Sequence, residues 1–197
     1  MSGGDDISRG VGNRIKGGVL VSRLAYIPAV GGAGALLRVM ARLSAADREI
    51  LQGYLLPTSW YPLDLNLRLD NAIAEELFAH DPRSGFLEMG RASAQKSLTG
   101  SQSMFLKAGD PHFLLAQAQV IYRMYYAVGK RSYEKSGPKS AVLRTSDAEA
   151  VTTTDCLTVV GWHIRALELC GASGVVVTEP RCRAKGDPVC EYELSWQ

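Results

Sequence analysis

Helical and strand-like patterns occupy different parts of this chain, and their order constrains the fold more than any other feature. Most of the first two-thirds has apolar side chains at helical spacing, whereas the chain ends in two short apolar runs around a Gly-Asp-Pro turn. Helices that come first and antiparallel strands that come last are typical of α+β proteins rather than of repeated βαβ units. We therefore predict an α+β fold, with helices packed against a small antiparallel sheet that includes a C-terminal β-hairpin.

Start and stop signals place the individual elements. Ser44 and Asp47 have the S-x-x-D spacing of a capping box, while Asp110 before Pro111 is typical of a helix start, with Gly129 just past its end. The predicted helices cover residues 31–43, 44–54, 63–79, 86–98, 110–129 and 155–172. The predicted strands cover residues 16–27, 141–146, 174–184 and 188–196, and a linker is predicted over 130–140.

Composition and length favour one globular domain. The chain has 197 residues, of which 46% are hydrophobic and 21% charged, and its formal net charge is +2. We predict a flexible tail over residues 1–14 and a single domain over 15–197. The scattered basic residues give no pattern for nucleic-acid binding. Since the tail lacks the apolar core of a secretory signal and the run 19–27 is too short to span a membrane, we expect a cytoplasmic protein.

Motifs for catalysis are weak. The segment GGAGALL has one G-x-G without the third glycine of a dinucleotide fingerprint. His80, His112 and His163 have no metal-binding spacing, and no carboxylate pair stands out as a general acid and base. We therefore expect no enzymatic activity.

The aromatic and methionine side chains allow two interpretations. They form either a filled core or the lining of a pocket for an apolar or aromatic ligand. His112 and Tyr122 are the polar groups that would favour a pocket. Ile121 and Tyr125 share the apolar face of the predicted helix 110–129, so we expect both to be buried.

Two of the four cysteines flank the predicted hairpin turn. With Gly186 at its apex, Cys182 and Cys190 lie opposite or nearly opposite each other, at a spacing that permits a disulfide or a shared metal ion. The third alternative is two small hydrophobes on neighbouring strands. Cys156 opens the preceding helix, where thiolates are favoured. Glu179 would face away from Cys182 in a regular strand, but Pro180 between them indicates a bulge that would turn the carboxylate round.

This set of residues resembles the zinc site of 4-vinyl-reductase-type domains, which include the aromatic-sensing input domains of phenol-responsive sigma-54-dependent activators. The similarity lies in the spacing of Cys156, Glu179, Cys182 and Cys190 and in the ending CRAKGDPVCEYELSW. The resemblance implies that these four residues bind one structural zinc ion, since four protein ligands leave no open position. Cys170 lies outside the set and is expected to be a small buried hydrophobe.

The same resemblance implies a fold related to the TRAPP vesicle-tethering subunits and a homodimer. It implies a bacterial, non-enzymatic regulatory domain that senses an apolar or aromatic small molecule and signals through an effector protein. The alternative is a structural adaptor resembling TRAPP subunits, whose cavity is filled by its own side chains. The residues that would bind the small molecule are not predicted.

Overall fold

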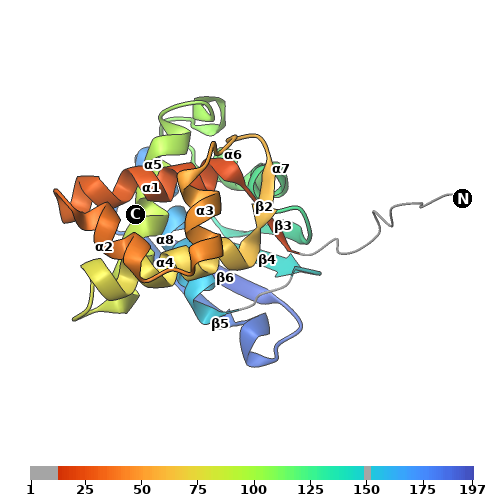
Figure 1. Cartoon of the computed structure of the whole chain (residues 1–197). Helices are drawn as coiled ribbons and strands as arrows, with labels where there is room; N and C mark the ends of the chain where they lie inside the picture. The colour runs from red at the N-terminus through yellow and green to blue at the C-terminus, as the bar shows by residue number, and fades with distance from the viewer. Residues whose placement is uncertain (1–12, 149–151) are drawn as a thin grey trace, which may run out of the picture.

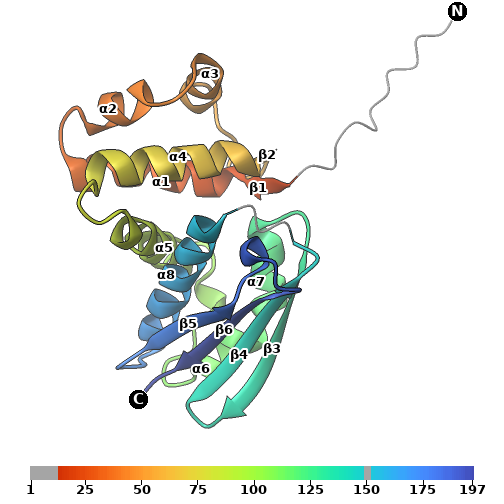
Figure 2. The same ribbon diagram turned by 90° about the horizontal axis from the view of Figure 1, so that it is seen from below.

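The computed structural model describes residues 13–148 and 152–197 and has the predicted α+β architecture (Figure 1). Four helices and a two-stranded ribbon form an N-terminal layer (Figure 2). These elements are β1 (Arg14–Lys16), α1 (Gly17–Gly31), α2 (Ala35–Ala41), α3 (Ala45–Gln52), β2 (Trp60–Pro62) and α4 (Leu63–Leu77).

A second unit, which contains the four-stranded sheet, lies below this layer in Figure 2. Its strands have the order β3-β4-β6-β5, and every neighbouring pair is antiparallel. The remaining elements are α5 (Pro82–Leu98), η1 (Ser103–Phe105), α6 (Pro111–Ala116), α7 (Ala118–Tyr125), β3 (Lys130–Gly137), β4 (Ser140–Ser146), α8 (Thr153–Leu169), β5 (Val176–Arg181), η2 (Arg183–Lys185) and β6 (Cys190–Ser195).

The predicted strand over residues 16–27 is wrong, because this segment forms most of helix α1. Its valines alternate, which favours a strand, but the buried side chains of Leu20, Arg23 and Ile27 recur at helical spacing. This face packs against α4 and α5 in the N-terminal layer. Tertiary burial thus overrode the strand preference of the β-branched residues.

The predicted linker over 130–140 is also wrong, since it contains strand β3 and the turn into β4. β3 is an edge strand whose polar residues are mostly exposed, so its sequence has little apolar alternation. Backbone pairing with β4 therefore defines this strand, with Tyr133 opposite Leu143.

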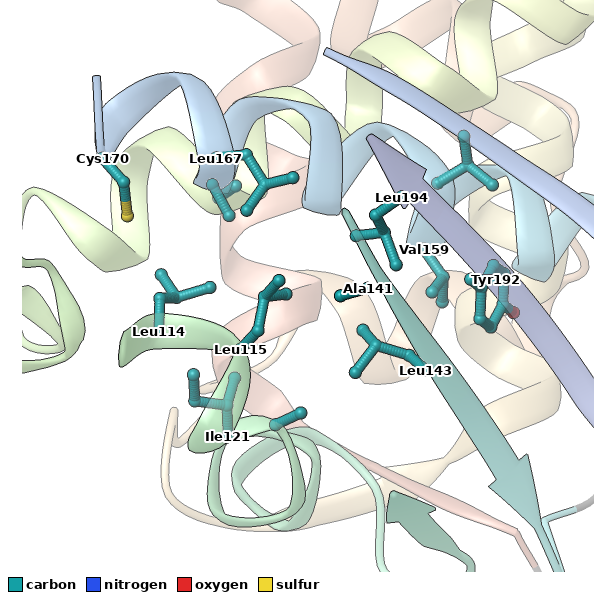
Figure 3. Packing of buried hydrophobic residues seen from close by; sticks show 14 of the residues in the cluster. Leu114, Leu115, Ile121, Ala141, Leu143, Val159, Leu167, Cys170, Tyr192 and Leu194 are labelled. Atoms are coloured by element: carbon teal, nitrogen blue, oxygen red, sulfur yellow. The ribbon is translucent and has the colours of Figure 1, made fainter. Parts of the chain in front are cut away.

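The predicted helix over 110–129 is interrupted. Asp110 caps its start by accepting a hydrogen bond from the amide of Phe113 at 3.1 Å, as expected. Gln117 then leaves helical geometry and separates α6 from α7. The break lets both short helices pack on the sheet, so that Leu114, Leu115 and Ile121 lie on the same side of the core (Figure 3). Ile121 is buried as predicted, whereas Tyr125 is half-buried.

Other predicted elements are confirmed with shifted ends. Ser44 accepts a hydrogen bond from the amide of Asp47 at the start of α3. The fifth helix begins at Pro82, four residues before the predicted start, because Asp81 caps it through the amide of Ser84. The inward face of the sheet carries Leu143, Tyr192 and other apolar side chains that pack against α6, α7 and α8 (Figure 3).

Two glycines allow helices α5 and α8 to cross in direct backbone contact. A Cβ atom placed on Gly90 would fall 2.8 Å from the backbone nitrogen of Trp162, and one placed on Gly161 would fall 2.8 Å from the carbonyl carbon of Leu87. Real Cβ atoms essentially never approach other atoms so closely. This crossing joins the N-terminal layer to the sheet unit, because α5 packs on α4 and α8 packs on β5.

The predicted tail lies outside the described residues as far as residue 12, and Arg14 already belongs to β1. Within residues 13–148 and 152–197, no helix has the length and apolar character needed to cross a membrane. The single-domain boundary at residue 15 and the cytoplasmic location stay predictions.

Candidate ligand cavity and cysteine cluster

A small cavity of about 70 Å³ lies where the N-terminal layer meets the sheet unit. Both units contribute to its wall, which is mostly apolar. The lining residues include Val19 and Arg23 of α1, Asn66 of α4, Ser93 of α5, Ile121 and Tyr122 of α7, and Trp162 and His163 of α8. Any movement of one unit relative to the other would change the shape of this space.

Arg23, which lines the cavity, belongs to a buried ion pair with Asp70. The Nε atom of Arg23 donates to Asp70 at 2.6 Å, and Asn66 donates to the same carboxylate at 3.1 Å. A second nitrogen of Arg23 donates to the carbonyl oxygen of Met89 at 2.9 Å and to the hydroxyl of Ser93. The guanidinium therefore ties α1 to α4 and α5 through groups that are buried, apart from the half-buried Ser93.

Two polar atoms at the cavity have no hydrogen-bond partner. The side-chain oxygen of Asn66 and the indole nitrogen of Trp162 are both buried without a partner among the described residues. An unpaired buried polar group costs roughly 1–3 kcal/mol. One acceptor and one donor are thus left for a bound molecule or water.

His163 contributes a neutral imidazole to the cavity wall. Burial, helped by the charge of Arg131, lowers the pKa of His163 to about 3. The ring lies 2.8 Å through Nδ1 from the carbonyl oxygen of Val159, which requires a proton on that nitrogen. Tyr122 also lines the cavity, and its hydroxyl donates to the carbonyl oxygen of Val128 at 2.9 Å.

His112 does not line the cavity. Its ring bonds to the Tyr133 hydroxyl at 2.8 Å and to the carbonyl oxygen of Pro138 at 2.9 Å, and it packs edge-on against Trp196. Both nitrogens are therefore engaged in joining α6 to the sheet. Of the two polar groups that the sequence suggested for a pocket, only Tyr122 lies there.

The four residues predicted as metal ligands come together in space. The ligand atoms of Cys156, Glu179, Cys182 and Cys190 all lie within 4.8 Å of one another. The Cys156 sulfur is 3.6 Å from that of Cys182 and 3.9 Å from that of Cys190. The predicted bulge brings Glu179 to this side, because the pairing of β5 with β6 shifts between Thr178 and Arg181.

The cluster differs from a disulfide and carries one unpaired acceptor. All four cysteines are free, and a disulfide would bring two sulfurs to about 2.05 Å. Thiolate–metal bonds of about 2.3 Å at tetrahedral angles place sulfurs about 3.8 Å apart, close to the observed spacing. One oxygen of Glu179 is buried without a partner. Cys170 is buried at the end of α8, outside the cluster, as predicted.

The thiols polarise one another. The hydrogen bond from the Cys156 thiol lowers the pKa of Cys190 to about 7, and the same bond together with burial raises the pKa of Cys156. Burial raises the pKa of Cys182. One thiolate near neutral pH is thus available to start the capture of a cation, since metals bind the thiolate form.

The family of this chain follows from a family-model match. A family model described as "Protein of unknown function (DUF2378)" matches residues 33–197, so the chain belongs to this family. No curated protein matches the sequence.

Solved structures with this fold are H-NOX proteins. An Fe(II) unliganded H-NOX protein from K. algicida has a TM-score of 0.67 and 10% identity, covering 92% of this chain and 96% of its own. An H-NOX protein from S. oneidensis in the Fe(II)NO state has a TM-score of 0.71 and 11% identity, covering 92% of this chain and 99% of its own. At such identity the likeness concerns the fold alone.

These findings correct two predictions. The 4-vinyl-reductase identification is wrong, because the family match and the H-NOX neighbours lie elsewhere. The spacing of four possible ligands describes one site near the C-terminus and carries no information about the first 110 residues. The prediction of zinc as the cofactor is also wrong, since the similar H-NOX proteins contain Fe(II) or heme and the cysteine cluster is only a possible metal site.

Heme does not fit the space that this chain provides. Pockets for drug-sized ligands have volumes of roughly 300–1,000 Å³, against about 70 Å³ for the cavity that contains His163. A separate outer cleft has a volume of about 600 Å³, but its lining contains neither His nor Cys, and the hydroxyl of its Tyr125 donates to Gln102. The central cavity thus contains a candidate iron ligand, His163, but lacks the volume that heme needs. The outer cleft has a larger volume, but neither His nor Cys lines it.

Sequence reasoning missed Arg23, Asp70 and Asn66 as members of a buried polar network. A usable signal exists for Arg23, which occupies the apolar helical face between Leu20 and Ile27. A charged residue on such a face is almost never fully buried without a partner. Reading the segment as a strand hid this signal.

Proposed function

We propose that this chain is a non-enzymatic regulatory domain that binds a small molecule in the cavity between its two units. The observation that carries the proposal is the pair of unpartnered polar atoms, on Asn66 and Trp162, in an otherwise mostly apolar wall. A ligand with one donor and one acceptor would satisfy both atoms. The Fe(II)NO state of an H-NOX protein with this fold, in which a small molecule is bound, supports this function.

The cavity volume restricts the ligand. A cavity of roughly 150 Å³ is enough for benzene, so about 70 Å³ admits a molecule of only a few heavy atoms. For this cavity we therefore propose a smaller neutral molecule instead of the aromatic ligand that was expected from the sequence. Binding would be transmitted through the two units that form the wall, to an effector protein and within a homodimer.

The first prediction concerns occupancy of the cavity. Native mass spectrometry of freshly purified protein should show a bound small molecule that is absent from Ile121→Trp, because the indole would fill a space that Ile121 now borders. Val120→Trp is the matched control, since Val120 is the neighbouring residue but is exposed. The Ile121 variant should remain folded, with a stability loss of roughly 1–3 kcal/mol.

Other results would refute the proposal. If native mass spectrometry shows no molecule bound to the wild type, and small neutral molecules do not raise its melting temperature, the domain is a structural adaptor with a filled core. If Ile121→Trp retains the bound molecule, the ligand lies outside the cavity.

A second candidate function is metal binding by the cysteine cluster. We propose that Cys156, Glu179, Cys182 and Cys190 hold one thiophilic divalent ion in a closed, structural site. The sulfur spacing of 3.6 and 3.9 Å and the unpartnered oxygen of Glu179 support this assignment. Such an ion would join the start of α8 to the hairpin of β5 and β6, since α8 and these strands have no shared backbone ladder.

The second prediction tests this cluster with Co²⁺ as the probe. Co²⁺ added to reduced, metal-stripped protein should produce thiolate charge-transfer absorption with a stoichiometry of about one ion per chain. Cys190→Ser should lose most of this absorption and the accompanying rise in melting temperature. Cys170→Ser should retain both, because Cys170 is buried away from the cluster. Equal absorption in the two variants, or none in the wild type, would contradict the assignment.

A further inference from the structure

The outer cleft is the largest cavity described in this structure, at about 600 Å³. It lies between α1, α5, α7 and the loop before β2. Val19, Ser93 and Tyr125 belong to both its wall and that of the central cavity, so they separate the two spaces. Its volume falls in the range of ordinary ligand pockets.

The charged groups of the cleft wall are all positive. Lys16 and Lys96 line it, and no Asp or Glu of residues 13–148 and 152–197 does. The ammonium group of Lys16 donates to the carbonyl oxygen of Thr58 at 2.8 Å and lies 3.9 Å from the centre of the Trp60 ring, which holds it in place. An ammonium group has three donors, so Lys16 retains capacity for a ligand. Lys96 has no ion pair within the described residues.

A buried amide adds neutral donors to the same wall. Gln102 is only 8% exposed and lines the cleft. Its side-chain oxygen accepts a hydrogen bond from the Tyr125 hydroxyl at 2.9 Å, and no residue in the described ranges accepts one from its NH₂ group. The NH₂ group is not among the buried atoms that lack a partner, so it is accessible from the cleft and can donate to an oxygen of a ligand.

The other features of the cleft wall do not suit a phosphate group as the ligand. Arginine, which grips phosphate through paired donors, is absent from the lining. The first amides of α1 are already used, because those of Gly17 and Gly18 donate to the carbonyl oxygens of Ser59 and Pro57 at 2.9 Å. Val21 and Met124 present apolar surface. The wall also carries hydroxyl groups, from serines, Thr58 and Tyr125. Two lysines, an amide and hydroxyl groups beside apolar side chains fit a single carboxylate on an apolar body.

We propose that the outer cleft binds an organic monocarboxylate, with its carboxylate near Lys96 and Gln102 and its apolar body against Val21 and Met124. This second site goes beyond the proposed function and does not depend on occupancy of the central cavity. Val19, Ser93 and Tyr125 line both spaces, so a ligand in one space would contact side chains that also border the other.

Calorimetry with octanoate tests the proposal on the full chain. Octanoate should bind, and the neutral analogue octanamide should bind about tenfold more weakly, because it lacks the charge. Lys96→Gln should weaken octanoate binding by about tenfold and leave octanamide unchanged. Lys135→Gln is the matched control, since Lys135 is exposed on β3, away from the cleft. Ser101→Trp, an exposed position in the cleft wall, should block both probes.

Several outcomes would overturn the assignment. Equal affinity for octanoate and octanamide would remove the role of the charge, and tighter binding of octyl phosphate would assign the cleft to phosphate esters. If octanoate does not bind at millimolar concentration, the cleft is not a monocarboxylate site. These results do not test the central-cavity proposal. That proposal is tested by native mass spectrometry of a co-purifying molecule in the wild type and in Ile121→Trp.

Discussion

Arg23→Met is expected to lower the free energy of unfolding by about 3–5 kcal/mol at neutral pH, the range for a buried charge that loses its partner. Arg23 and Asp70 are 4% and 2% exposed. Without the guanidinium, the Asp70 carboxylate keeps only the hydrogen bond from Asn66, and the carbonyl oxygen of Met89 loses its donor. Denaturant unfolding of the variant measures the loss.

A double variant separates loss of charge pairing from loss of packing. Arg23→Met/Asp70→Leu should be more stable than Arg23→Met alone, because replacing both members of a buried pair with apolar groups is often neutral or stabilising. Arg42→Met is the surface control, since Arg42 pairs with Glu75 and Glu76 while 40% exposed. Its cost should stay below about 1 kcal/mol. Equal losses for Arg23→Met and Arg42→Met would mean that the interior pair is not desolvated.

Gly161→Ala is expected to cost about 3 kcal/mol or more, although alanine is the better helix former by about 1 kcal/mol. The added methyl group would collide with the carbonyl group of Leu87 on α5. This obstacle is backbone, which does not move aside as a flexible side chain does. The α5–α8 crossing must therefore open, and the loss of melting temperature measures the cost.

Gly18→Ala provides the comparison within the same protein. Gly18 also lies in a helix, but a Cβ atom there would meet its nearest neighbour, the carbonyl oxygen of Pro57, at 3.5 Å, an ordinary contact. This variant should be neutral or stabilised by up to about 1 kcal/mol. If both variants have the same stability, close backbone packing at the crossing does not explain why Gly161 is needed.

Local chemistry made part of the fold predictable. The capping serine at Ser44 and the capping aspartate at Asp110 satisfy amides within three residues, so each acts without help from the rest of the chain. Pro180 likewise predicted the bulge that brings Glu179 to the cysteine side. The full set of four came from the resemblance to a known zinc site, and the structure brings their ligand atoms together although Cys156 lies 26 residues from Cys182.

Other elements were decided by partners distant in sequence. α1 is a helix because its buried face packs on α4 and α5, and β3 is a strand because β4 pairs with it. The break at Gln117 lets α6 and α7 both reach the sheet. None of these partners is visible within a short window of sequence, so local preference favoured the wrong state in each case.

An α+β chain and several helix starts could be predicted from the amino-acid sequence, because caps and turns act over a few residues. The pairing of Arg23 with Asp70, 47 residues apart, and the position of His163 rather than His112 in the cavity follow from the packing of distant segments. This packing also decided the cavity volume, which excludes heme and aromatic molecules from that space. Such properties depend on how distant helices pack, and packing is a property of the assembled chain.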